Sequence, residues 1–215
     1  MTDLTLGERA LEWSKLEEQD GVCEEPLGSS TGKRIREYFA PATRVIKGQE
    51  VKLGLRKGHW CAVACCAATY AVLLDDEVAP TAYRCSGFEL ENDAKASGLW
   101  RPKALVLDGG WVPAPGDVCI LDRGGGWKRH VARVVHAGNS SFVTLGGNEQ
   151  NRWRFSDRRY DNEDLLGFIE FPRPYAVLSA SEATRLYELS RGVMAGEGDD
   201  LEAIMADVDK AEKRG

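Results

Sequence analysis

The sequence predicts an α+β fold in which N-terminal helices pack on a C-terminal antiparallel β-sheet meander. Two observations lead to this prediction. In the first half of the chain apolar residues recur at helical spacing, whereas from residue 118 onward they alternate with a period of two. Glycine-rich turns separate the alternating segments, as they commonly do between antiparallel strands. Because the helices come first, they should cover one face of a single sheet.

Four helical segments are predicted before residue 100. Residues 4–19 carry an apolar stripe, and Thr5 with Glu8 has the spacing of an N-terminal capping box. The other three are a short helix before Pro41, residues 61–74 and residues 81–98. Residues 41–58 alternate only weakly, which fits either a hairpin or a basic loop.

Five strands and a C-terminal extension complete the predicted organisation. The strands are residues 118–121, 130–136, 142–145, 152–155 and 166–171. Residues 1–175 should therefore form one domain, and residues 176–215 should form a helical extension. The apolar stripe of the extension is thin, so the extension should dock on a neighbour, pair with another chain or stay mobile.

Composition and charge narrow the function classes. The formal net charge of -6 argues against a nucleic-acid partner, because phosphate binding requires a basic surface. No apolar run is long enough to span a membrane, and the first twenty residues do not resemble a signal peptide. We therefore expect synthesis in the cytoplasm and no membrane partner. Six irregularly placed cysteines do not make a disulfide framework.

Cys61 is the candidate nucleophile. It begins the long apolar segment 61–74, which should be a helix buried on most of its faces. The helix dipole and the unpaired N–H groups of a first helical turn stabilise a thiolate and lower the pKa of its thiol. Cys65 and Cys66 lie further along and are interpreted as buried core residues. Cys61, Cys65 and His59 lack the further ligands of a zinc site, so no metal is predicted.

His130 is the candidate base for this cysteine, and Asn148 is the candidate group that orients the imidazole. His130 opens a strand after a glycine-rich turn and shares a face with Ala132 and Val134. Asn148 follows the next strand, so a hairpin could place its amide oxygen beside the imidazole, as in a Cys-His-Asn triad. The alternatives are a structural histidine and an asparagine that only forms a turn.

Four motifs occur in an order that resembles the CHAP-type cysteine amidases and peptidases of the NlpC-like, papain-like group. They are Trp60-Cys61-Ala62, Pro113-Ala114-Pro115-Gly116-Asp117-Val118, the glycines before His130-Val131, and Leu145-Gly146-Gly147-Asn148. The resemblance covers about residues 5–171. It implies a papain-like fold and a peptidoglycan hydrolase, either an amidase or an endopeptidase, that needs no cofactor.

The resemblance also implies roles for individual residues. Cys61 would be the nucleophile, His130 the general base and acid, and Asn148 the orienting residue. Trp60, His59 and Gly147 flank these positions and are candidates for substrate binding. The substrate would be a peptidoglycan peptide, cleaved through a thioester acyl-enzyme.

Two alternatives remain open at this point. The chain could be an intracellular cysteine protease or acyltransferase acting on a protein, or a catalytically silent binding module on the same fold. A hydrolase without its own export signal would need delivery to the cell wall by a phage or secretion system. Residues 179–215 could provide the docking element for that delivery.

Overall fold

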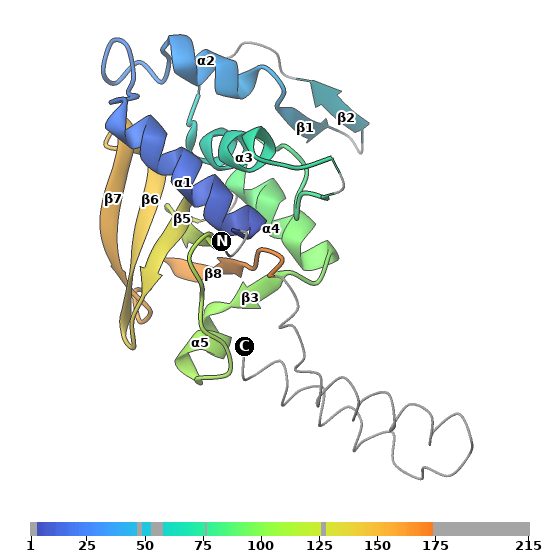
Figure 1. Ribbon diagram of the computed structural model, residues 1–215, viewed down its shortest axis with the longest axis vertical. Helices are drawn as coiled ribbons and strands as arrows, with labels where there is room; N and C mark the ends of the chain where they lie inside the picture. Colours follow the sequence, from blue (N-terminus) through green and yellow to red (C-terminus); the bar gives the residue numbers. More distant parts are fainter. Residues whose placement is uncertain (1–3, 47–48, 53–57, 76, 126–127, 174–215) are drawn as a thin grey trace, which may run out of the picture. The chain divides into compact units, whose positions relative to one another are not determined.

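The structure is a computed structural model that describes residues 4–46, 49–52, 58–75, 77–125 and 128–173. The chain divides into two units, Met1–Pro172 and Arg173–Gly215. The predicted helical extension, residues 176–215, lies outside the described residues. The first unit has the α+β class that the sequence predicts (Figure 1).

Helices dominate the first half of the unit. They are α1 (Leu6–Gln19), α2 (Lys33–Phe39), α3 (Cys61–Ala71), α4 (Gly87–Ala96) and α5 (Lys103–Leu107). The predicted capping box of α1 is present, because the Thr5 hydroxyl accepts from the Glu8 N–H and the Glu8 carboxylate accepts from the Thr5 N–H. The sequence did not predict the short helix α5.

Helix α4 begins six residues later than the predicted helix 81–98. The backbone of the preceding segment pairs with strand β1 (Thr43–Ile46) instead, since the Thr43 N–H donates to the Tyr83 carbonyl and Thr43 forms a β-bridge with Arg84. Gly87 then starts the helix against the sheet, where an added Cβ would lie 2.6 Å from a methyl carbon of Val131. The tertiary contacts of these residues therefore override their local helical pattern.

The strands form a two-stranded hairpin and a six-stranded antiparallel sheet. The hairpin consists of β1 (Thr43–Ile46) and β2 (Gln49–Lys52), which decides between the two interpretations of residues 41–58. The large sheet has the order β3-β8-β4-β5-β6-β7. Its strands are β3 (Trp100–Pro102), β4 (Val118–Asp122), β5 (Arg129–Ala137), β6 (Ser141–Glu149), β7 (Arg152–Arg159) and β8 (Leu165–Ile169).

Only β4 to β7 form a simple meander, so the prediction of a meander throughout was wrong. Strand β8 returns to the other side of β4 and lies between β4 and β3. The residues of β8 are buried on both faces of the sheet, with only Leu166 partly exposed, whereas β7 alternates between buried and exposed positions near its start. A strand that is apolar on both faces gains more from an interior position than from an edge.

Helix α3 is the centre of the core. Residues 61–69 of this helix are all buried, as the sequence predicts, and α1, α2, β5 and β6 pack around it. The guanidinium of Arg133, a fully buried residue of β5, donates to the Cys65 carbonyl at 3.0 Å and to the Thr69 hydroxyl at 2.9 Å. These hydrogen bonds fasten α3 to the strand that also carries His130, and they fix the position of the first turn of the helix.

Candidate active site

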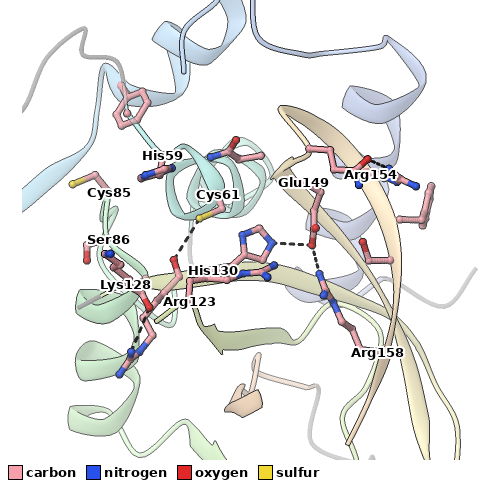
Figure 2. Close-up of a pocket in the computed structure, with 18 of the residues that line it drawn as sticks. His59, Cys61, Cys85, Ser86, Arg123, Lys128, His130, Glu149, Arg154 and Arg158 are labelled. Carbon is pink, nitrogen blue, oxygen red and sulfur yellow. Dashed lines mark hydrogen bonds and ion pairs between the residues drawn. The ribbon is translucent and has the colours of Figure 1, made fainter. Parts of the chain in front are cut away.

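Cys61 is the first residue of α3, and its sulfur faces a cleft (Figure 2). The helix starts here because Trp60 is not helical, and the Ala64 N–H closes the first turn on the Trp60 carbonyl at 2.9 Å. The first N–H groups of a helix lack acceptors within it, so they are available to stabilise negative charge. The Cys61 thiol also lies 3.8 Å from the Arg129 carbonyl oxygen, an acceptor for its proton.

His130, at the second position of β5, has its imidazole beside the Cys61 sulfur (Figure 2). Burial alone would raise the pKa of the Cys61 thiol, but the interaction with His130 and the charge of His130 outweigh burial and hold that pKa below its usual value. The backbone N–H groups of Ala62 and Val131 lower it further. Cys61 thus has both a neighbouring histidine and backbone N–H groups that lower the pKa of its thiol.

The imidazole of His130 lies between Cys61 and the carboxylate of Glu149 (Figure 2). Its Nε2 atom is 2.8 Å from Oε1 of Glu149, which leaves Nδ1 for the sulfur. Burial alone would lower the pKa of His130, but its interactions with Cys61 and Glu149 raise that pKa to about 9. His130 is therefore protonated at neutral pH, and its positive charge favours the thiolate form of Cys61.

Arg158, on β7, contacts the same oxygen of the Glu149 carboxylate as His130 does (Figure 2). Burial alone would raise the pKa of Glu149, but the hydrogen bonds and charges of His130 and Arg158 lower it to about 2. Glu149 therefore stays ionised at neutral pH and can hold the imidazolium in place. The row of groups from Arg158 to Cys61 alternates in charge.

The side chain that contacts His130 is thus Glu149, and not Asn148, for which the sequence predicts this place. Regular alternation in β6 would place Asn148 on the face of Gly146, where an added Cβ would lie 2.9 Å from Ala132 and on which His130 lies. The register between β6 and β7 shifts between Gly146 and Glu149, and Asn148 has a left-handed φ of 61°. This bulge moves Glu149 onto the face predicted for Asn148.

Two of the predicted substrate-binding residues are packing residues. Trp60 is fully buried among Tyr38 and Trp153, and its indole N–H donates to Glu24 at 3.1 Å. Gly147 packs on the same indole, where an added Cβ would lie 2.5 Å from a ring carbon of Trp60. Neither residue lines the cleft, so both position the site from behind.

The third candidate, His59, is exposed and lines the cleft beside Cys61 (Figure 2). The cleft has a volume of about 1150 Å³ and is also lined by His130, Asn148 and Glu149. Its size suits an extended chain rather than a single small molecule. His59 is therefore placed where a substrate could reach it.

The remaining cysteines are buried or half-buried and lie apart from this arrangement. Burial raises the pKa of Cys65, Cys66 and Cys119 to about 12, so these thiols stay protonated at neutral pH. The interpretation of Cys65 and Cys66 as core residues is confirmed. His136 is exposed near the end of β5, well after His130 in the strand.

The described part of the chain offers no cluster of three or more His, Cys, Asp or Glu side chains that could hold a metal ion. None of the helices in that part is long and apolar enough to cross a membrane. Comparison with known proteins adds no assignment: neither a protein family, nor a curated protein, nor a solved structure matches this chain.

Proposed function

We propose that this protein is a cysteine hydrolase that cleaves an amide bond through Cys61, His130 and Glu149. The observation that carries the proposal is the row in which the Glu149 carboxylate lies 2.8 Å from His130 and the imidazole of His130 lies beside the Cys61 sulfur at the start of a helix. A nucleophile, a base and a group that orients the base are the components of a catalytic triad. A core cysteine would gain nothing from such partners.

The reaction would start from the thiolate and imidazolium. The Cys61 sulfur attacks the amide carbonyl carbon, a C–S bond forms, and the carbonyl electrons move to the oxygen. The N–H groups of the first turn of α3, including that of Cys61, would stabilise this oxyanion. When the C–N bond breaks, His130 gives its proton to the leaving amine, and a thioester remains.

Hydrolysis of the thioester regenerates the site. His130, now neutral, takes a proton from a water molecule as the oxygen attacks the thioester carbonyl. The C–S bond then breaks, a carboxylic acid leaves, and the thiolate and imidazolium are restored. Throughout both steps the negative charge of Glu149 stabilises the protonated imidazole and fixes its orientation.

The substrate that we propose is a peptide of peptidoglycan, cut by amidase or endopeptidase activity in a papain-like domain. Support comes from the order of the elements, with the nucleophile on a helix and the base on a following antiparallel sheet. The sequence resemblance to the CHAP-type enzymes points the same way. The large cleft is consistent with a branched or extended peptide.

Purified full-length protein incubated with bacterial sacculi tests this proposal. Mass analysis should find released fragments with new amine and carboxyl ends. Cys61→Ser should abolish their release, because a serine hydroxyl in the same position is a far weaker nucleophile than a thiolate. Cys65→Ser is the matched control, since that thiol is buried and protonated. Equal release by wild type and Cys61→Ser would contradict the proposed function.

A further inference from the structure

The cleft around Cys61 has a positive lining in a protein with a formal net charge of -6. Its described lining contains two acidic residues, Glu149 and Asp157. The lysine and arginine residues that line it are Arg44, Arg123, Lys128, Arg129, Arg154 and Arg158. Glu149 is already neutralised by His130 and Arg158, so it contributes little negative potential.

Some of these cations serve the protein itself. Arg129 pairs with Glu91 at 2.9 Å and with Asp122 at 3.3 Å, and Arg158 is committed to Glu149. Both side chains are largely buried. Both guanidinium groups are therefore engaged in internal ion pairs, and neither is available to bind a ligand.

Of the other four cations, Arg44 pairs with Glu89 at 3.8 Å, and the remaining three are exposed and available. Arg123 and Lys128 are exposed, and among the described residues no carboxylate pairs with either side chain. Arg154 is also exposed, and its hydrogen-bond partner is the neutral amide of Gln150. Figure 2 shows Lys128 on one side of the Cys61 and His130 pair and Arg154 on the other. Free positive charge thus flanks the nucleophile on two sides.

We propose that the cleft selects an acyl substrate whose peptide carries carboxylate side chains or a free carboxylate near the scissile amide. Arg123 and Lys128 would bind it on one wall and Arg154 on the other. This proposal rests on the proposed cysteine hydrolase function. A concave site lined by one sign of charge raises the local concentration of oppositely charged ligands.

The loop beside these cations favours a carboxylate over a phosphate group. Backbone N–H groups of a glycine-rich turn often bind phosphate, but here two of the described N–H groups already have acceptors. The Gly125 N–H donates to the Asp122 carboxylate at 2.7 Å, and the Arg123 N–H donates to the Lys128 carbonyl at 3.1 Å. The cations that remain are single, long side chains set apart from one another, which suits separate carboxylates along a peptide.

Two full-length variants test the proposal. The cleft variant carries Arg123→Gln, Lys128→Gln and Arg154→Gln. The matched control variant carries Lys33→Gln, Arg36→Gln and Arg152→Gln, which are exposed cations that do not line the cleft. Both lose three positive charges, so a difference between them reports on the cleft and not on net charge.

The first readout compares two alkylating reagents of similar size, anionic iodoacetate and neutral iodoacetamide. At low salt the cleft variant should lose about tenfold in the ratio of iodoacetate to iodoacetamide rates at Cys61. The control variant should keep the wild-type ratio. Raising the salt to about 1 M should lower the wild-type ratio towards that of the cleft variant, because the screening length falls to about 3 Å. An equal ratio in the cleft variant and the wild type would overturn the proposal.

The second readout is binding to Cys61→Ala protein, which needs no reactive thiol. Calorimetry should show that a peptide with three glutamates binds about tenfold more tightly than its glutamine counterpart, and that the cleft substitutions remove this preference. Equal binding of the two peptides would overturn the proposal, as would binding of polyphosphate without binding of the glutamate peptide. If the glutamate peptide binds preferentially but wild type hydrolyses no substrate, the hydrolase function is refuted and the preference of the cleft for acidic peptides is still supported.

Discussion

The Nε2 atom of His130 lies 2.8 Å from Oε1 of Glu149, and Arg158 contacts that same oxygen. One imidazole nitrogen is thereby fixed, which leaves the other for the Cys61 sulfur beside the ring. The carboxylate carries a full negative charge, whereas the amide predicted for this role would carry only a dipole. The site therefore stabilises an imidazolium more strongly than a Cys-His-Asn arrangement would.

Glu149→Gln should greatly slow hydrolysis. The substitution keeps the size of the side chain but removes the charge that holds His130 protonated and oriented, so we expect a loss on the order of 10²- to 10⁴-fold in rate. The measurement is the initial rate of fragment release from sacculi. Asn148→Gly is the comparison, because glycine accepts the left-handed φ of 61° at that position. A larger loss in Asn148→Gly than in Glu149→Gln would restore Asn148 as the orienting residue.

The alkylation rate of Cys61 should depend on pH in a way that requires His130. In wild type the thiolate forms below the usual pKa of a thiol, so iodoacetamide should react at mildly acidic pH. In His130→Gln, burial is no longer opposed by an imidazolium, and the pH midpoint of alkylation should rise. Hydrolysis should decline as the pH rises through about 9, where His130 loses its proton. An unchanged alkylation midpoint in His130→Gln would show that the two side chains are not coupled.

Glu149 should also make stability depend on pH in the acid range. Its pKa is about 2 in the folded protein and near 4.5 when it is unperturbed, so its ionised form stabilises the fold above about pH 4.5. That contribution should disappear as the pH falls from about 4.5 to about 2. Urea unfolding of wild type and Glu149→Gln at several pH values measures it. The difference between their unfolding free energies should shrink over this range, and a constant difference would contradict the assignment.

Gly147→Ala should destabilise the fold, because its Cβ would lie 2.5 Å from the Trp60 ring and 2.6 Å from the Cβ of Ala64. Overpacking of this kind costs about 1–3 kcal/mol of unfolding free energy. Gly58→Ala is the control for stability, since its Cβ would meet Phe39 at an ordinary 3.7 Å. Denaturant titration separates the two outcomes. If Gly147→Ala were as stable as Gly58→Ala, the close packing of β6 on α3 would be disproved.

Much of this arrangement could be predicted from sequence because it depends on local patterns. The position of Cys61 at a helix start followed from the apolar run behind it, and the strand carrying His130 followed from alternation. The bulge before Glu149 could not be predicted, because Gly146-Gly147-Asn148 permits several turn geometries and each one places a different residue beside the histidine. If regular strand alternation is continued through this segment, it places Asn148 beside the histidine.

Long-range packing accounts for the other differences. Trp60 was expected at the surface of the site because of its neighbour Cys61, but an aromatic cluster with Trp153 buries it. Strand β8 was expected to extend the meander, yet its apolar residues on both faces favour the position beside β4. Both outcomes depend on residues more than forty positions away in sequence, which local periodicity does not encode.

The central claim is that Cys61 is an activated nucleophile, and the most direct measurement is competitive alkylation of the folded protein at about pH 6. A limiting amount of iodoacetamide is added, and peptide mass spectrometry reports the fraction of each cysteine that is modified. Cys61 should be alkylated well before Cys65, Cys66 and Cys119, and His130→Gln should remove that preference. Alkylation of Cys61 no faster than that of the core cysteines would contradict the account.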